Sequence, residues 1–173
     1  RDDIRVAAVS DVADPVSLEY LLRFDTILGR FPEEVSIKDG YLYVIGRQIP
    51  FLLAKGPADA DWASLGVDIV IEATAKRRTR AEFDQYLERG VKRVILCAPP
   101  ADPPDATIVI GANVDWLAPA HRIVSNASCT AHCVAPVLKI LHGAFGIRKA
   151  FLTSVHAYTN QQRLADVPSE DAR

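Results

Sequence analysis

The sequence has no methionine, few cysteines and no long apolar run, and each of these features limits what the protein can be. A chain that lacks methionine and begins with Arg1 is expected to be a piece of a longer polypeptide. Three cysteines are too few, and odd in number, for a disulfide framework, which favours reduced thiols and a cytoplasmic location. No apolar run approaches the roughly 18 residues of a membrane-spanning helix, so a membrane partner is not expected.

The chain also lacks an excess of positive charge. Lys and Arg total 20 against 22 Asp and Glu, which gives a net charge of -2. This balance argues against nucleic acid as a partner, because nucleic-acid binding depends on cationic side chains. With 49% hydrophobic residues in 173, the chain can bury a core of one domain, or of one domain and part of a second.

Patterns typical of strands alternate with patterns typical of helices. Buried strands are predicted at Ile4–Ser10, Val67–Thr74, Val91–Ala98, Thr107–Gly111 and Ile123–Asn126. Helices are predicted from Pro15, over Arg77–Arg89 before Gly90, and over Ser128–Gly146. Short antiparallel strands are predicted within Val35–Leu53 and a long strand at Lys149–Tyr158. This alternation predicts an α/β fold with a parallel sheet.

Asp11 follows the first predicted strand. In dinucleotide-binding folds, an acidic residue at the end of the second strand binds the adenosine ribose, about 20 residues after a glycine-rich turn. No glycine precedes Gly29, so that turn is expected to lie before Arg1. An aspartate after a strand is otherwise a turn residue or a helix cap, and both interpretations of Asp11 stay open.

The segment from Ser125 to Cys133, Ser-Asn-Ala-Ser-Cys-Thr-Ala-His-Cys, is typical of a nucleophile at a helix start. Ser128 is suited to the N-cap and Cys129 to the first turn. The positive end of the helix dipole lowers a thiol pKa there, and the unpaired backbone N–H groups can bind an oxyanion. The alternative is a small buried hydrophobic residue.

His156 is predicted to lie beside Cys129. A helix from Cys129 to Phe145 rises about 25 Å, and a strand from Arg148 to His156 returns about 30 Å. The two residues would then form a nucleophile and its base, reactive toward a carbonyl carbon. A histidine late in a strand is otherwise a hydrogen-bonded structural residue.

A zinc site is a weaker alternative for the same segment. Cys129, His132 and Cys133 share a helix face by their spacing. However, no fourth ligand or second cysteine pair lies nearby in the sequence, so no metal is expected.

Two motifs together resemble the phosphorylating glyceraldehyde-3-phosphate dehydrogenase family. They are Ser-Asn-Ala-Ser-Cys-Thr at 125–130 and Ser-Val-His-Ala-Tyr-Thr-Asn at 154–160, and their separation also matches. The resemblance extends to Val9–Pro15, Val67–Thr74, Arg93–Pro99 and Leu164–Pro168. It implies a Rossmann-like, doubly wound NAD-binding domain over residues 1–127, followed by the start of an α+β catalytic domain over 128–173.

The resemblance also implies roles for individual residues. Cys129 would attack the aldehyde of glyceraldehyde 3-phosphate, His156 would act as base, and inorganic phosphate would cleave the resulting thioester. Phosphate contacts are implied for Ser128, Thr130 and Thr159, and contacts to the cofactor NAD for Asp11, Thr74 and Cys97. The full-length protein would be a homotetramer, and the isolated chain is expected to be nearly inactive.

The sequence departs from the family pattern at four positions. Ser10 and His132 each stand where the family usually has Asn, Ala75 stands where it has Gly, and Cys97 stands where it has Ser or Thr. Two other functions stay open. One is oxidation of a different phosphorylated aldehyde, such as erythrose 4-phosphate, although Tyr158-Thr159-Asn160 favours the triose enzyme. The other is a non-catalytic binding or assembly module that keeps the fold.

Overall fold

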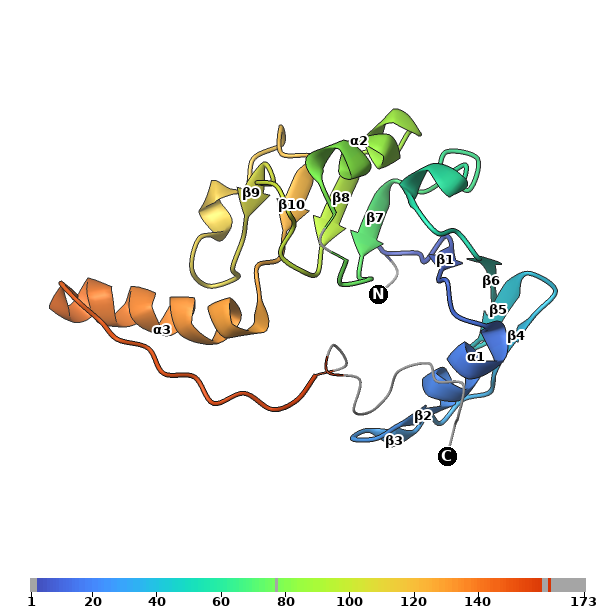
Figure 1. Cartoon of the computed structure of the whole chain (residues 1–173), viewed down its shortest axis with the longest axis horizontal. Helices are drawn as coiled ribbons and strands as arrows, with labels where there is room; N and C mark the ends of the chain where they lie inside the picture. Colours follow the sequence, from blue (N-terminus) through green and yellow to red (C-terminus); the bar gives the residue numbers. More distant parts are fainter. Residues whose placement is uncertain (1–2, 77, 160–161, 163–173) are drawn as a thin grey trace. The chain divides into compact units, whose positions relative to one another are not determined.

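The computed structural model of the chain describes residues 3–76, 78–159 and 162, which form two compact units (Figure 1). The first unit contains the residues up to Gly66 and those from Ala157 onward, and the second contains Val67–His156. Each unit has a four-stranded sheet with at least one parallel strand pair, and at least one helix. The α/β fold class predicted from the sequence is therefore confirmed.

The sheet of the first unit has the order β1-β6-β5-β4. The strands are β1 (Val9–Ser10), β4 (Val35–Lys38), β5 (Tyr41–Val44) and β6 (Arg47–Leu52). As predicted, β4, β5 and β6 are antiparallel, whereas β1 runs parallel to β6. The strand predicted at Ile4–Ser10 is confirmed only at its end, because only Val9 and Ser10 pair with β6.

Helix α1 (Pro15–Arg23) covers this sheet and begins as its sequence predicts. The Asp14 carboxylate accepts hydrogen bonds from the N–H groups of Val16 and Ser17, and Pro15 occupies the first helical position. Leu18 packs against a core of buried side chains from the three antiparallel strands, which are Val35, Leu42, Ile49 and Phe51.

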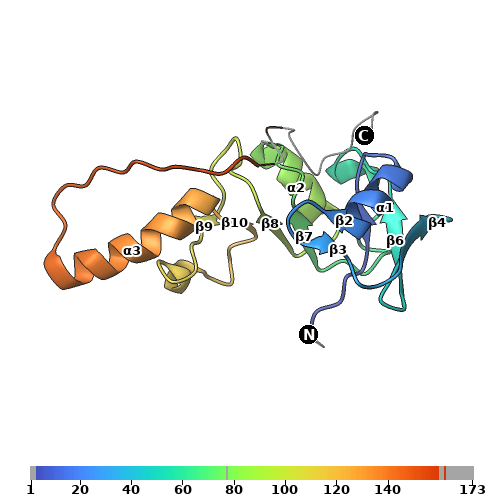
Figure 2. The same cartoon turned by 90° about the horizontal axis from the view of Figure 1, so that it is seen from below.

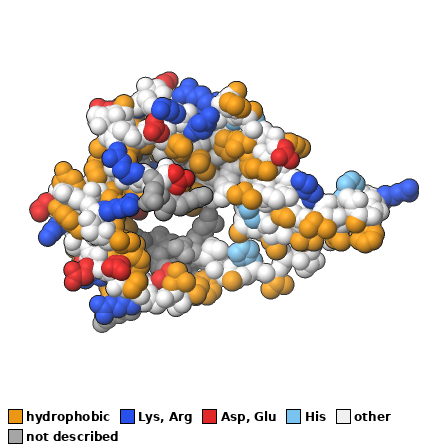
Figure 3. Space-filling view, turned by 180° about the vertical axis from the view of Figure 1, so that it is seen from behind, with side chains coloured by type: hydrophobic (Ala, Val, Ile, Leu, Met, Phe, Trp, Pro, Cys, Tyr) orange, Lys and Arg blue, Asp and Glu red, His pale blue; other side chains and the backbone are white. Residues whose placement is uncertain are grey.

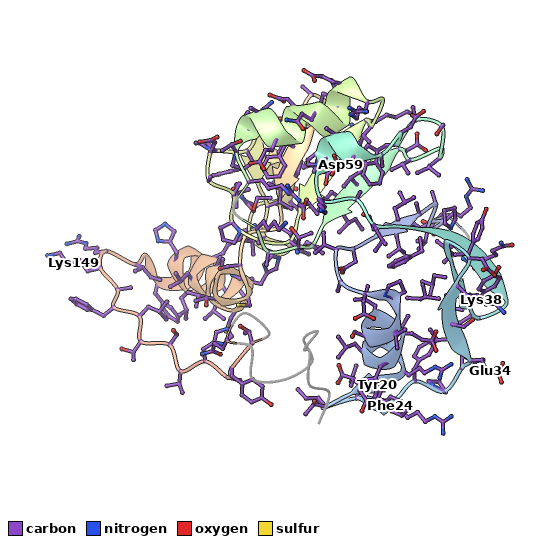
Figure 4. The ribbon with its side chains drawn as sticks, turned by 45° about the vertical axis from the view of Figure 1, so that its right-hand side comes forward. Tyr20, Phe24, Glu34, Lys38, Asp59 and Lys149 are labelled. Carbon is purple, nitrogen blue, oxygen red and sulfur yellow. The ribbon has the colours of Figure 1, made fainter. Side chains whose placement is uncertain are left out.

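A small hairpin after α1 was not predicted. It joins β2 (Phe24–Asp25) to β3 (Gly29–Arg30), and the rings of Tyr20 and Phe24 lie 4.9 Å apart where α1 ends (Figure 4). The signal was weak because each strand has only two residues. A short 3-10 helix at Pro57–Asp59 precedes the second unit.

The sheet of the second unit is wholly parallel, in the order β7-β8-β10-β9. Its strands are β7 (Ile69–Glu72), β8 (Arg93–Leu96), β9 (Ala106–Thr107) and β10 (Ile123–Ser125). Helix α2 (Arg80–Glu88) connects β7 to β8 and packs on β8 (Figure 2). This is the Rossmann-type arrangement of parallel strands and crossover helix that the sequence predicts.

The buried apolar residues of the second unit include residues of α2 and of the sheet. Phe83 on α2 is buried with residues of β8 and β10, namely Val94, Leu96 and Ile123. Thr79 and Glu82 form a reciprocal capping box at the start of α2, and Gly90 lies just past its end with a positive φ of 88°. A second 3-10 helix spans Val114–Trp116.

Helix α3 (Cys129–Phe145) follows β10 and is the longest helix. Ser128 caps its start, and Gly146, in a left-handed conformation at φ 71°, ends it. Its residues are partly or wholly exposed, and hydrophobic side chains gather on the surface over it (Figure 3). No helix in the described part of the chain is long and apolar enough to cross a membrane.

The predicted strand at Lys149–Tyr158 is wrong. After Gly146 the chain turns near Lys149 (Figure 4) and returns toward the start of α3 as an extended segment (Figures 1 and 2). Its alternating apolar residues favour an extended backbone, but a strand also needs a neighbour to pair with. Among the described residues, no strand pairs with 149–158.

Candidate active site

The structure brings together Cys129 and His156. Cys129 is the first residue of α3, and the extended segment returns His156 to it, so that Sγ lies 3.1 Å from Nε2. Both side chains are exposed and can therefore be reached by a ligand. This is the geometry of a nucleophile with an adjacent base.

The start of α3 favours the thiolate form of Cys129. The hydrogen bond with His156 is the largest of the effects that lower the pKa of this thiol. Hydrogen bonds from the backbone and side chain of Thr130 lower the pKa further. Ser128 Oγ accepts the Ala131 N–H at 3.1 Å, which fixes the first turn of the helix around the sulfur. The Thr130 N–H therefore donates to the Cys129 sulfur, and the Ala131 N–H donates to the capping Ser128 side chain.

Ala127 makes the turn between β10 and α3 in a left-handed conformation, at φ 53°. Its side chain is buried, and its N–H donates to Ser125 Oγ at 3.1 Å. This conformation costs a non-glycine residue about 1–2 kcal/mol. Backbone strain of this kind is typical of functional sites, and here it directly precedes the residue that caps the Cys129 helix.

The other two thiols are also exposed. Cys97 was expected inside a buried strand, and this expectation is wrong, because β8 ends at Leu96 and Cys97 lies in the following turn. Cys133, one helical turn beyond Cys129, is exposed as well. Exposure therefore does not distinguish the three thiols, whereas the contact with His156 distinguishes Cys129.

Asp11 lies just past the carboxyl end of β1. Its N–H donates to the Leu52 carbonyl of the neighbouring strand, and its Oδ1 accepts the N–H groups of Val12 and Ala13 at 2.6 and 2.9 Å. The carboxylate thus makes the turn contacts that one of its two predicted roles requires. The cofactor role stays a prediction.

Thr74 and Cys97 follow two neighbouring parallel strands, β7 and β8. Both residues consequently lie at the carboxyl edge of the sheet, where open α/β sheets bind ligands. The Thr74 hydroxyl donates to Glu72 Oε1 at 2.5 Å. The next residue, Ala75, has a positive φ of 58°, a conformation that glycine adopts without steric cost.

Thr159 belongs to the first unit, and its N–H donates to Gln162 Oε1 at 2.8 Å. Its part in the site stays a prediction. The motif at Leu164–Pro168 lies outside the described residues.

Sequence reasoning missed a buried polar cluster beside Thr74. Glu72, Arg78 and Tyr86 are each less than a tenth exposed, and Glu72 Oε2 accepts from Arg78 Nε at 2.8 Å and from Tyr86 Oη at 3.0 Å. The sequence signal for this cluster was weak: a single carboxylate, Glu72, at the end of an otherwise apolar strand. No group of three or more His, Cys, Asp or Glu side chains in the described residues is placed to hold a metal ion.

Two family models match the chain at its two ends. Residues 1–80 match the glyceraldehyde 3-phosphate dehydrogenase NAD binding domain, and residues 128–173 match the C-terminal domain of the same enzyme. The chain belongs to the glyceraldehyde-3-phosphate dehydrogenase family. The family resemblance found in the sequence is thereby confirmed.

Curated relatives named glyceraldehyde-3-phosphate dehydrogenase match along almost the whole chain. The Streptomyces coelicolor protein is 46% identical over 172 residues, the Geobacillus stearothermophilus protein 44% over 172, and the Thermotoga maritima protein 43% over 171. Each match covers 99% of this chain and 51% of the relative. The chain therefore spans about half the length of these glyceraldehyde-3-phosphate dehydrogenases.

Proposed function

We propose that the protein containing this chain oxidises glyceraldehyde 3-phosphate with NAD and inorganic phosphate, using Cys129 as nucleophile and His156 as base. The observation that carries this proposal is the 3.1 Å contact between Cys129 Sγ and His156 Nε2 at the start of α3. The curated names of the relatives support the same reaction.

The two residues supply what the chemistry requires. The Cys129 thiolate forms a bond to the aldehyde carbon, and His156 donates a proton to the oxygen, giving a thiohemiacetal. His156 then takes the hydroxyl proton back as hydride leaves the same carbon, giving a thioester. A phosphate oxygen attacks this thioester, the carbon–sulfur bond breaks, and Cys129 is released as a thiolate next to His156.

NAD, when bound, would accept the hydride. The chain offers residues that fit it: the Asp11 carboxylate is an acceptor for ribose hydroxyls, and it follows a parallel strand as such a residue must. Thr74 and Cys97 are proposed as further contacts, since both lie at the carboxyl edge of β7 and β8.

Ser128, Thr130 and Thr159 are proposed to bind the phosphate groups of the substrate and of the attacking phosphate. Ser128 Oγ accepts the Ala131 N–H, and its own hydroxyl hydrogen can be donated to a phosphate oxygen. For the whole protein we propose an NAD-binding domain over 1–127, a catalytic domain beginning at 128, a homotetramer and a cytoplasmic location.

The test is turnover by the protein expressed from its complete open reading frame. NADH formation is followed with glyceraldehyde 3-phosphate or erythrose 4-phosphate, with and without inorganic phosphate, beside a Cys129→Ser variant. Phosphate-dependent turnover that prefers the triose and disappears in the variant is expected. A preference for the tetrose would reassign the substrate, and no turnover with either would identify a non-catalytic module.

A further inference from the structure

The geometry points to Glu72 as a positioning residue that fixes the Thr74–Ala75 turn and makes the Thr74 hydroxyl a hydrogen-bond acceptor toward a bound ligand. This inference rests on the proposed function in one respect, namely that the ligand at this turn is NAD. The role of Glu72 in the turn itself follows from the second unit alone.

The two carboxylate oxygens of Glu72 have separate partners. Oε1 accepts from the backbone N–H of Thr74 at 3.0 Å and from the Thr74 hydroxyl at 2.5 Å. Oε2 accepts from Arg78 Nε at 2.8 Å and from Tyr86 Oη at 3.0 Å. One oxygen thus holds the turn, while the other is held by Arg78 and by a residue of α2.

The carboxylate must be ionised to accept all four bonds. Burial raises the pKa of Glu72, but the hydrogen bonds from Thr74, the charge of Arg78 and the hydrogen bond from Tyr86 outweigh it, so the pKa is lowered overall. Arg78 is itself buried and forms a further ion pair with Glu82 at 3.4 Å. The cluster is therefore a rigid, charge-compensated support under the turn.

The turn that this cluster supports is strained. Ala75 has φ 58°, a left-handed conformation that an alanine adopts only when its surroundings impose it. The two bonds to Glu72 Oε1 hold the residue immediately before it, and Thr74 Oγ1 accepts the Lys76 N–H at 3.4 Å immediately after it. Glu72 therefore contributes to the conformation of the Thr74–Ala75 turn, which follows the carboxyl end of β7.

The direction of the hydroxyl bond decides the chemistry of a ligand contact. A threonine hydroxyl has one hydrogen, and Thr74 gives it to Glu72. Toward a ligand the oxygen can then only accept, so the matching group on the cofactor is an N–H or O–H donor, such as an amide or a ribose hydroxyl. A phosphate oxygen does not fit this position.

The experiment uses the protein from the complete open reading frame as wild type and as the variants Glu72→Met, Thr74→Val and Thr74→Ser, since methionine is about as long as glutamate but offers Thr74 no oxygen acceptor. Glu82→Gln is the matched control, because it removes the other carboxylate beside Arg78 but no bond to Thr74. Backbone amide exchange is measured over residues 70–80, and NAD affinity is measured by titration. If Glu72→Met fails to fold beside the buried Arg78, the double variant Glu72→Met with Arg78→Met replaces it.

We expect Glu72→Met to speed amide exchange at Thr74 several-fold or more and to weaken NAD binding about tenfold, the size of one hydrogen bond to a charged group. Thr74→Val should weaken binding similarly, Thr74→Ser should weaken it less than Thr74→Val because serine keeps the hydroxyl, and the control Glu82→Gln should leave it near wild type. Unchanged exchange in Glu72→Met overturns the positioning role. If wild type binds NAD but Thr74→Val binds equally well, the acceptor role is overturned. If wild type binds no NAD, the proposed function fails while the exchange result still decides the role of Glu72.

Discussion

Cys129 Sγ and His156 Nε2 lie 3.1 Å apart although 27 residues separate them in the sequence. Helix α3 carries the chain away from Cys129, and the extended segment after Gly146 carries it back. The contact depends on both α3 and the extended segment. The reactivity of the Cys129 thiol therefore reports on the structure of the whole region from residue 129 to residue 156.

The first prediction is that limiting iodoacetamide labels Cys129 before Cys97 and Cys133. All three thiols are exposed, so accessibility alone would label them equally. The thiolate is the reactive form, and the bond to His156 favours it at Cys129. Peptide mapping after partial labelling measures the order. Earlier labelling of Cys97 or Cys133 would remove the basis for the site.

The second prediction concerns pH. The pKa of Cys129 is lowered, so the thiolate forms at a lower pH than in a free thiol and the alkylation rate rises at lower pH. We expect the midpoint of the rate–pH profile to lie below that of glutathione. His156→Asn should move the midpoint up, since it removes the largest cause of the lowered pKa. His142→Asn, late in α3, is the control and should leave the profile unchanged.

The Cys129–His156 pair could be predicted because element lengths decide it, and a helix and an extended return of similar length bring their ends together. The backbone at Ala75 and Ala127 could not be predicted, because alanine gives no signal for a left-handed conformation. The strand predicted at 149–158 is absent because alternation of apolar and polar residues indicates only an extended backbone. Whether that backbone pairs with another strand depends on residues elsewhere in the chain.

The cluster around Glu72 was missed for a related reason. Its members, at positions 72, 78 and 86, come from a strand, a loop and a helix, and only the fold brings them into contact. Each of them alone is unremarkable in the sequence. Their burial, which makes them informative, is a property of the packed unit.

The third prediction is that Ala75→Gly stabilises the protein by about 1 kcal/mol, because glycine adopts a positive φ without the cost that alanine incurs. Ala81→Gly is the matched control within α2, where the same substitution should destabilise by a similar amount. Urea unfolding of the three proteins measures both effects. Destabilisation by Ala75→Gly would show that the alanine side chain contributes more than its backbone strain costs.

The fourth prediction is a preference for NAD over NADP. The Asp11 carboxylate would repel a ribose 2′-phosphate, and no arginine stands at the next two positions to offset it. Asp11→Asn keeps an oxygen that can accept the N–H groups of Val12 and Ala13, so the turn is retained while the charge is lost. The ratio of kcat/KM values for the two cofactors should fall about tenfold or more in this variant. An unchanged ratio would assign Asp11 to the turn alone.

The last prediction is that the 173-residue chain by itself turns over little or no aldehyde, while its Cys129 still reacts with iodoacetamide. The two activities differ in what they need. Thiolate reactivity depends on the start of α3 and on His156, and both belong to the second unit. Hydride transfer also needs a cofactor held within about 3–3.5 Å of the reacting carbon.

Holding the cofactor requires a binding site for its pyrophosphate. In dinucleotide-binding folds this site is formed by a glycine-rich turn and a helix N-terminus. No glycine precedes Gly29 in these 173 residues, and the chain spans about half the length of its curated relatives. The measurement compares the 173-residue chain with the product of the complete open reading frame, in NADH formation and in Cys129 labelling. Labelling should be similar in the two proteins, whereas turnover should differ by orders of magnitude. Equal turnover would show that the glycine-rich pyrophosphate site is dispensable. The cofactor would then be bound by residues other than those proposed.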